Sequence, residues 1–257
     1  MVETQALAPD ARPTAISWTG GKDCNLSLLD AWRNPKRVTS LVVFRPQDAV
    51  FRAHPLKLAE AQAECLGLPL LHVIIPSDTP DYKAAYVAGM RQLRAEHGIE
   101  VIATGDMDLV GSMARNWIEE CGEEAGIEAF LPLWQADRGA LLRRLLAEGF
   151  VVVFSCVKSP WFDGSWVGRR LDAAAVETME DMAAAPPPPL DGGGGGAKPL
   201  DLGGERGEYH TMVLAGPLYA RAVPLEAGEP LELRDQPGQK AGERWWTIGV
   251  DTVDVNK

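Results

Sequence analysis

Aliphatic runs and helical patterns alternate along the first 158 residues. Runs rich in Val, Ile and Leu predict strands at 14–18, 38–44, 70–75, 101–104 and 150–157. Between them, apolar residues recur every three or four positions, which predicts helices at 25–33, 54–67, 82–97, 112–121 and 137–148. An alternation of this kind predicts an α/β protein with a doubly wound, mainly parallel sheet over residues 13–158.

The alternation stops after residue 158, where a loop and then a helix are predicted over residues 159–182. Residues 183–202 hold a run of prolines and a run of five glycines, a composition that cannot build a packed element, so we predict a linker. Residues 203–257 form a smaller C-terminal region. Residues 212–214 are strand-like, and the alternating apolar and polar positions of 230–234 and 245–255 predict a small antiparallel sheet.

Composition narrows the class of protein. The chain has 257 residues, of which 46% are apolar, and a formal charge of −11 from 25 basic and 36 acidic side chains. This acidity argues against a partner held chiefly through nucleic-acid phosphates. The four cysteines lie far apart and form no CxxC pair, which is typical of reduced intracellular thiols. No apolar run is long enough to cross a membrane and no secretory signal precedes the first strand, so we expect the cytoplasm.

The stretch Ser17-Trp18-Thr19-Gly20-Gly21-Lys22-Asp23-Cys24 joins the first predicted strand to the first predicted helix. Two adjacent glycines let the backbone approach a ligand closely, and the helix behind them directs unpaired N–H groups and its positive end at the loop. Lys22 adds a charge suited to phosphate, and Thr19 and Cys24 add side-chain donors. The spacing excludes the Walker loop, but the pattern predicts an anion cradle.

The strand at 101–104 runs into Gly105 and Asp106. Ligands of open α/β sheets bind beyond the carboxyl ends of the strands, so Asp106 is predicted to hold a magnesium ion or contact a ribose. Asp108 is as well explained as a cap of the following helix. Arg115, early in that helix, is either a surface charge or a phosphate contact.

The C-terminal region opens with Gly203-Gly204-Glu205-Arg206-Gly207-Glu208-Tyr209-His210-Thr211. Taken alone, this stretch is most simply an exposed hairpin tip. The functional alternative is that its glycines expose backbone amides while Glu205 and Glu208 orient an amine or stabilise developing positive charge.

The first of these motifs resembles the Ser-Gly-Gly-Lys-Asp-Ser loop of ATP pyrophosphatases, with Thr19 and Cys24 in place of the two serines. Four further motifs are similar to the diphthine–ammonia ligase family, and the resemblance covers residues 15 to about 220. They are Glu60-Ala61-Gln62-Ala63-Glu64 with Leu66-Gly67-Leu68-Pro69-Leu70, Thr104-Gly105-Asp106, Leu131-Pro132-Leu133-Trp134 and Gly-Glu-x-Gly-Glu-Tyr-His-Thr at 204–211.

The resemblance implies an adenine nucleotide alpha hydrolase-like fold and a reaction. ATP adenylates the carboxylate of diphthine on elongation factor 2, ammonia attacks the mixed anhydride, and the products are an amide, AMP and pyrophosphate. The implied partners are that factor and ammonia, without a membrane or direct nucleic-acid contact. Residues 13–158 become the ATP-binding unit and 203–257 the substrate side.

The resemblance also assigns roles to individual residues. The implied ATP-binding residues are Ser17, Thr19, Gly20, Gly21, Lys22, Asp23, Cys24, Gly105 and Asp106. The implied catalytic residues are Lys22, Glu205 and Glu208, the implied Mg²⁺ ligands are Asp23 and Asp106, and the implied substrate-binding residues are Arg115, Gly207, Tyr209, His210 and Thr211.

Two other hypotheses remain at this point. A tRNA-modifying ATP pyrophosphatase is expected to bring a basic surface and, in many cases, paired cysteines. A nucleotide-binding sensor would use the same fold without chemistry.

Arg206 departs from the family pattern and places a bulky charge beside the expected acceptor site.

Overall fold

A computed structural model describes residues 4–5, 8, 11–47, 53–109, 113–188, 198–225, 228–234, 239 and 242–248. Its elements in chain order are β1 (Pro13–Ser17), α1 (Lys22–Arg33), β2 (Arg37–Pro46), α2 (Leu56–Leu66), β3 (Leu70–Ile75), α3 (Tyr82–His97), β4 (Val101–Ala103), α4 (Trp117–Ala125), β5 (Glu128–Phe130), α5 (Arg138–Ala147), β6 (Val151–Lys158), α6 (Ala173–Ala184), β7 (Tyr209–Ala215), β8 (Pro230–Leu233) and β9 (Trp245–Ile248). A short 3₁₀ turn, η1 (Gly164–Trp166), follows β6.

The first five strands form one parallel sheet in the order β3-β2-β1-β4-β5. Successive side chains of a strand point to opposite faces, so the aliphatic runs bury both sides. Ile16 and Leu41 pack with α1 and α2 on one face, whereas Ala15 and Val42 pack with α3 and α4 on the other. The predicted doubly wound α/β fold is confirmed.

A second, antiparallel sheet has the order β7-β6-β9-β8. The strand at 150–157 was expected to belong with the parallel unit of residues 13–158, but β6 pairs with β7 and β9 instead. The physical reason is that β6 is buried on both faces, as a central parallel strand would be, so its sequence does not reveal which sheet it joins.

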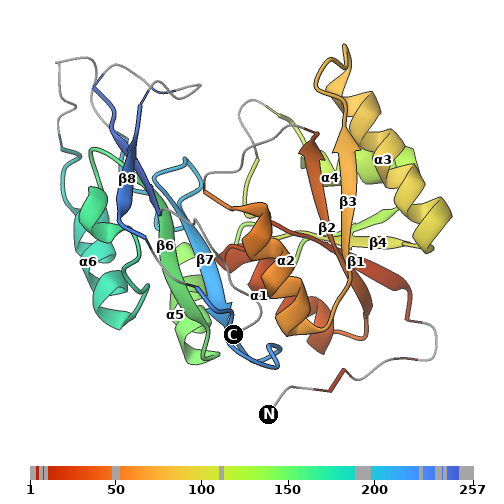
Figure 1. Cartoon of the computed structure of the whole chain (residues 1–257), viewed down its shortest axis with the longest axis horizontal. Helices are drawn as coiled ribbons and strands as arrows, with labels where there is room; N and C mark the ends of the chain where they lie inside the picture. Colours follow the sequence, from red (N-terminus) through yellow and green to blue (C-terminus); the bar gives the residue numbers. More distant parts are fainter. Residues whose placement is uncertain are drawn as a thin grey trace.

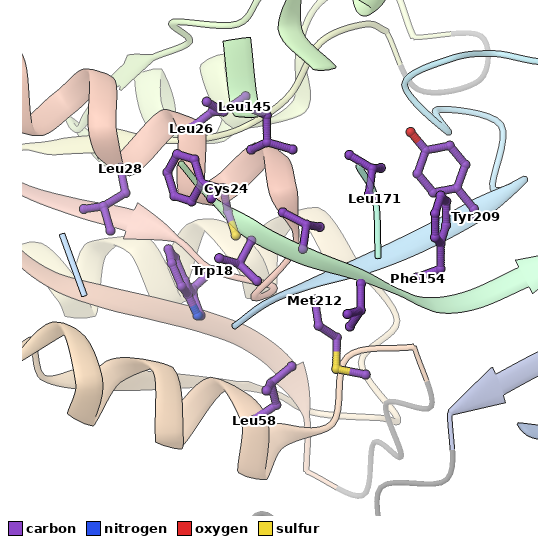
Figure 2. Packing of buried hydrophobic residues seen from close by; sticks show 14 of the residues in the cluster. Trp18, Cys24, Leu26, Leu28, Leu58, Leu145, Phe154, Leu171, Tyr209 and Met212 are labelled. Atoms are coloured by element: carbon purple, nitrogen blue, oxygen red, sulfur yellow. The ribbon is translucent and has the colours of Figure 1, made fainter. Parts of the chain in front are cut away.

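The two sheets share one hydrophobic core. Helices α1 and α2 lie between them (Figure 1), so each of these helices faces apolar residues on two sides. Figure 2 shows Phe154 and Met212 of the second sheet in the same cluster as Trp18 and Leu58. This packing brings the C-terminal strand β7 against the loop that joins β1 to α1.

Several element ends differ from the sequence prediction. Helix α4 begins at Trp117, because the Asn116 side chain accepts hydrogen bonds from the amides of Ile118 and Glu119 and caps the helix there. The first two residues of the predicted linker complete α6. Residues 189–197 of that linker and 249–255 of the last predicted strand lie outside the described residues.

No helix in the described part of the chain is both long and apolar enough to cross a membrane.

Candidate active site

The glycine loop turns sharply between β1 and α1. Gly20 has φ +83°, a conformation that glycine adopts without strain, and Gly21 caps α1 with no side chain of its own. The Asn25 side-chain amide donates from Nδ2 to the Gly21 carbonyl over 2.8 Å. The Tyr219 hydroxyl in turn donates to Asn25 Oδ1 over 2.8 Å. The loop is therefore held from its own helix and from the C-terminal region.

The 203–211 stretch lies directly against this loop. Thr211 Oγ1 accepts a hydrogen bond from the Lys22 amide over 3.1 Å, across 189 residues of sequence. The Val213 amide donates to the Gly20 carbonyl over 3.0 Å. The Gln62 side-chain amide donates to the carbonyls of Gly20 and Val213, over 2.9 and 2.8 Å. Two motifs far apart in sequence thus form one site.

Thr211 supplies the N-terminal cap that Gly21 lacks. Replacing Thr211 by Val removes the acceptor for the Lys22 amide and should lower the free energy of unfolding by about 1 kcal/mol. Urea denaturation measures this loss. Thr178→Val is the matched control, since Thr178 is partly exposed on α6 and its hydroxyl donates to the Ala174 carbonyl of its own helix. Equal unfolding midpoints for the two variants would contradict the capping role.

The Lys22 side chain joins the two motifs. It is only 5% exposed, and its Nζ donates to Asp23 Oδ2 over 2.8 Å and to the Gly203 carbonyl over 2.5 Å. The same atom lies 5.1 Å from the centre of the Tyr209 ring. Burial acts to lower the pKa of Lys22, but Asp23, Tyr209 and Glu205 outweigh it and the pKa is raised. Lys22 therefore keeps its positive charge throughout the neutral range.

Glu208 shapes the loop that carries Gly203. It is 5% exposed, and its two carboxylate oxygens accept from the backbone amides of Asp201 and Arg206, each over 3.1 Å. Both oxygens are thus directed at the loop itself. The sequence predicted a catalytic role for Glu208, whereas in the structure both of its carboxylate oxygens bind backbone amides of its own loop.

The Arg206 side chain is directed toward Pro199. Its guanidinium donates to the Pro199 carbonyl over 2.7 Å, and its own carbonyl accepts from Lys158 Nζ over 3.1 Å. Gly207 has φ +76°, which turns the chain between the two glutamates. Tyr209 is buried and its hydroxyl donates to the Leu202 carbonyl over 2.5 Å.

Glu205 is the carboxylate of this loop that remains open to a ligand. It is exposed, unlike Glu208. Partial desolvation and the nearby carboxylates of Asp23 and Asp201 raise the pKa of Glu205 to about 7, against the opposing charges of Lys22 and Arg138. A carboxyl group that titrates near neutral pH can both accept and return a proton.

The end of β4 packs on the start of α1. A Cβ on Gly105 would lie 2.5 Å from the carbonyl carbon of Asp23 and 2.7 Å from the amide nitrogen of Cys24. Asp106 follows, with Oδ1 accepting from Thr104 Oγ1 and Oδ2 from Asn116 Nδ2, both over 2.7 Å. Asp106 is therefore held in a fixed orientation beside the glycine loop.

The donors present suit a partial magnesium site. Mg²⁺ is commonly held by one or two carboxylates together with substrate phosphates and waters. Asp23 and Asp106 match that donor set. The described residues contain no cluster of three or more His, Cys, Asp or Glu side chains that could hold a metal by themselves.

Comparison with known proteins finds a similarity in the first part of the chain. Residues 12–129 match the family model of the diphthamide synthase N-terminal domain. The match takes in the parallel sheet and the glycine loop, slightly less than half of the chain. A diphthine–ammonia ligase of Schizosaccharomyces pombe is 23% identical over 235 residues, which cover 83% of this chain. The chain spans 36% of the length of that relative.

Two solved structures are also similar, both weakly. A predicted subunit of tRNA methyltransferase from Methanocaldococcus jannaschii is 18% identical at a TM-score of 0.38, over 55% of this chain and 77% of its own. An L-sorbose reductase from Gluconobacter frateurii is 15% identical at a TM-score of 0.23, over 53% of this chain and 44% of its own. Neither likeness bears on function.

Two residues of the matched segment lie differently from expectation. Arg115, expected to contact substrate, is half-exposed and forms a paired ion contact with Glu123, at 2.9 and 2.5 Å. Cys24 is buried, which raises the pKa of its thiol, and Sγ donates to the Gly21 carbonyl over 3.2 Å. Cys24 therefore stabilises its own loop as a neutral thiol. Ser17 ends β1 and Thr19 Oγ1 lies 3.7 Å from Cys24 Sγ.

Sequence reasoning missed three residues that hold the site together: Gln62, Asn25 and Tyr219. Gln62 carried a usable signal, because a glutamine on the apolar face of a predicted helix must find buried partners. Asn25 and Tyr219 carried none, since either residue is as common on a surface as in a core.

Proposed function

We propose that this protein amidates the carboxylate of diphthine on elongation factor 2, using ATP and ammonia and releasing AMP and pyrophosphate. The observation that carries the proposal is the hydrogen bond from Lys22 Nζ to the Gly203 carbonyl, which places the phosphate loop beside the loop with Glu205. The family of residues 12–129 and the ligase relative support it. The reaction belongs in the cytoplasm, where translation takes place.

The glycine loop fits the first half of the reaction. A carboxylate is a poor acyl donor, because its leaving group would be oxide, and adenylation replaces that group by AMP. The bond between the α and β phosphates breaks, so charge develops on the departing pyrophosphate. The backbone at Gly20 and Gly21, the positive end of α1 and the Lys22 ammonium would stabilise that charge. A magnesium ion held by Asp23 and Asp106 would neutralise further phosphate charge.

The 203–211 loop fits the second half. Ammonia is present at neutral pH mostly as ammonium, which cannot attack a carbonyl until it loses a proton. Glu205 lies near Asp23 and Asp201, so this corner attracts a small cation and offers a base. In the proposed step, ammonium first loses a proton to solvent. The ammonia nitrogen then forms a bond to the acyl carbon, the bond from that carbon to AMP breaks, and Glu205 takes the proton that the nitrogen loses. Glu208 and Gly207 hold Glu205 in place.

Glu205→Gln tests this assignment. In the wild type, with the concentration of free ammonia held constant, the rate of amide formation should rise with pH around a midpoint near 7, because only the ionised carboxylate accepts a proton. The variant should lose that step in the pH profile and fall by about 10² to 10⁴-fold in rate, with ATP binding retained. Rates are followed as AMP release between pH 6 and 8.5.

Glu100→Gln is the control for the pH profile, because Glu100 is exposed just ahead of β4. An unchanged profile in Glu205→Gln would remove Glu205 from the reaction.

A further inference from the structure

Two histidines from distant parts of the chain meet beside the glycine loop. His54 lies just before α2, and His210 lies in β7 of the second sheet. Their rings are 5.2 Å apart between centroids and nearly perpendicular. His210 directly precedes Thr211, whose hydroxyl accepts from the Lys22 amide. The two histidines therefore lie at the junction between the two sheets, beside the glycine loop.

His54 forms part of the wall around Gly21. Its Cε1 atom lies 3.5 Å from where a Cβ on Gly21 would stand, and the Thr211 carbonyl and Thr19 Oγ1 lie 3.3 and 3.6 Å from the same point. Cε1 is bonded to both ring nitrogens, so each nitrogen is one bond from the atom that faces the loop. The absence of a side chain at Gly21 lets the His54 ring lie close to the backbone of the glycine loop.

The Nδ1 atom of His54 is buried and has no hydrogen-bond partner among the described residues. A buried polar atom without a partner costs about 1–3 kcal/mol, so such atoms are rare unless a ligand or water completes them. The neighbouring loop is an anion cradle with the N-terminus of a 12-residue helix behind it. A phosphate oxygen is the partner that this position suits.

The charges around the pair are positive. Burial, together with His210 and Lys22, lowers the pKa of His54 to about 3. Burial, Lys22 and Lys158 lower the pKa of His210 to about 4. Both rings are therefore neutral at physiological pH while the cradle holds no anion. A phosphate chain bound there would offset Lys22 and favour the protonated rings.

We propose that His54 and His210 bind the β and γ phosphates of the nucleotide, and the pyrophosphate that leaves, and take up a proton from solvent as they do so. The inference rests on the proposed use of ATP and adds two phosphate ligands to the glycine loop and Lys22. Protonated imidazoles donate from both nitrogens, so uptake turns the unpartnered Nδ1 into a donor to phosphate. Loss of that proton would then help pyrophosphate leave.

The sign of the linkage follows from the direction of proton movement. If binding takes up a proton, binding tightens as pH falls between the pKa values of the bound and free rings. The phosphates also titrate in this range, so the histidine contribution is the difference between wild type and variant. One unit of pKa change corresponds to about a tenfold change in affinity.

The test uses the full chain with magnesium and inorganic pyrophosphate, and separately with magnesium and ATP. Isothermal titration at pH 6 and pH 8, in buffers of different ionisation enthalpy, gives the affinity and the number of protons taken up. His54→Asn and His210→Asn should each weaken pyrophosphate binding by about tenfold more at pH 6 than at pH 8. Proton uptake should fall in both.

Two controls guard against loss of folding and general charge effects. His97→Asn changes an exposed histidine at the end of α3 and should leave affinity and proton uptake unchanged. In the unaltered chain, NMR of the imidazole Cε1–H groups should show two rings becoming protonated on pyrophosphate addition at pH 6. The exposed His72 and His97 serve as internal references.

Any outcome other than the expected pH-dependent loss of affinity and proton uptake overturns the inference. If the wild type binds ATP and pyrophosphate but the His54 and His210 variants bind equally well, or lose affinity equally at both pH values, the pair is not a proton-linked phosphate ligand and the proposed function stands. If the wild type binds neither compound, the proposed function fails together with the inference.

Discussion

Lys22→Met will lower AMP formation by at least about 10²-fold, the loss typical when one charge-stabilising donor is removed from an active site. Lys22 is a buried cation whose ammonium contacts Asp23, next to the glycine loop, and the Gly203 carbonyl. Methionine preserves the length of the side chain but stabilises no phosphate charge and donates no hydrogen bond to Gly203. The comparison is between steady-state AMP release by variant and wild type, with folding checked by circular dichroism.

The chain contains a matched control for this lysine. Lys36 also pairs with a carboxylate, Glu128 at 3.5 Å, and also lies over an aromatic ring, Phe130 at 5.0 Å. It directly precedes β2 and so lies at the amino ends of the parallel strands, whereas the glycine loop lies at their carboxyl ends. Lys36→Met should therefore retain full activity. A Lys22→Met variant that releases AMP at the wild-type rate would exclude the phosphate role of Lys22.

Gly105→Ala will disrupt both the fold and nucleotide binding. The added Cβ would stand 2.5 and 2.7 Å from backbone atoms of Asp23 and Cys24, contacts that real Cβ atoms do not make. Backbone cannot swing aside as a long side chain can, so β4 and the start of α1 must move apart. Overpacking of this kind costs about 1–3 kcal/mol, and the displaced helix end no longer faces the cradle.

Gly67→Ala is the control for Gly105→Ala, because it introduces backbone strain without displacing a neighbouring element. Gly67 has φ +66° and nothing within 4 Å of the position of its Cβ, so alanine there brings backbone strain of about 1–2 kcal/mol but no clash. Thermal unfolding should place both variants below wild type. ATP binding should be lost in Gly105→Ala and kept in Gly67→Ala. Normal ATP binding by Gly105→Ala would show that the β4 end does not position the loop.

The parallel sheet was readable from the sequence because its three central strands, β2, β1 and β4, are largely buried on both faces and are therefore aliphatic runs. The limits 70–75 and 82–97 were predicted to the residue, since Pro76, Asp81 and Gly98 punctuate the chain there. Sheet membership was not readable for β6, whose doubly buried pattern suits either sheet. Only the pairing of β6 with β7, more than fifty residues later, decides between the sheets.

The meeting of the two motifs could not be derived from periodicity. No local rule places Thr211 at the cap of α1 or Gly203 at Lys22 Nζ, because each contact follows from how the second sheet packs on α1 and α2. Resemblance to a family suggested a shared site, and the geometry supplied the contacts.

Residue type also proved a weak guide to orientation. Glu205 and Glu208 look equivalent in the sequence, yet one is exposed and the other is folded onto the amides of its own loop. Arg115 shows the same limit, since it precedes α4 and its charge is directed to Glu123 on that helix. Which way a side chain points depends on partners that the local pattern does not specify.

The most direct measurement incubates the full chain with magnesium, ATP, an ammonium salt and elongation factor 2 that carries diphthine. AMP release and the mass of the modified histidine are followed together. The account predicts conversion of the acid to the amide with one AMP released per amide, and only when ATP, ammonium and the modified factor are all present. AMP release without the mass change would contradict the diphthine assignment, and no AMP under any condition would favour a sensor that only binds nucleotide.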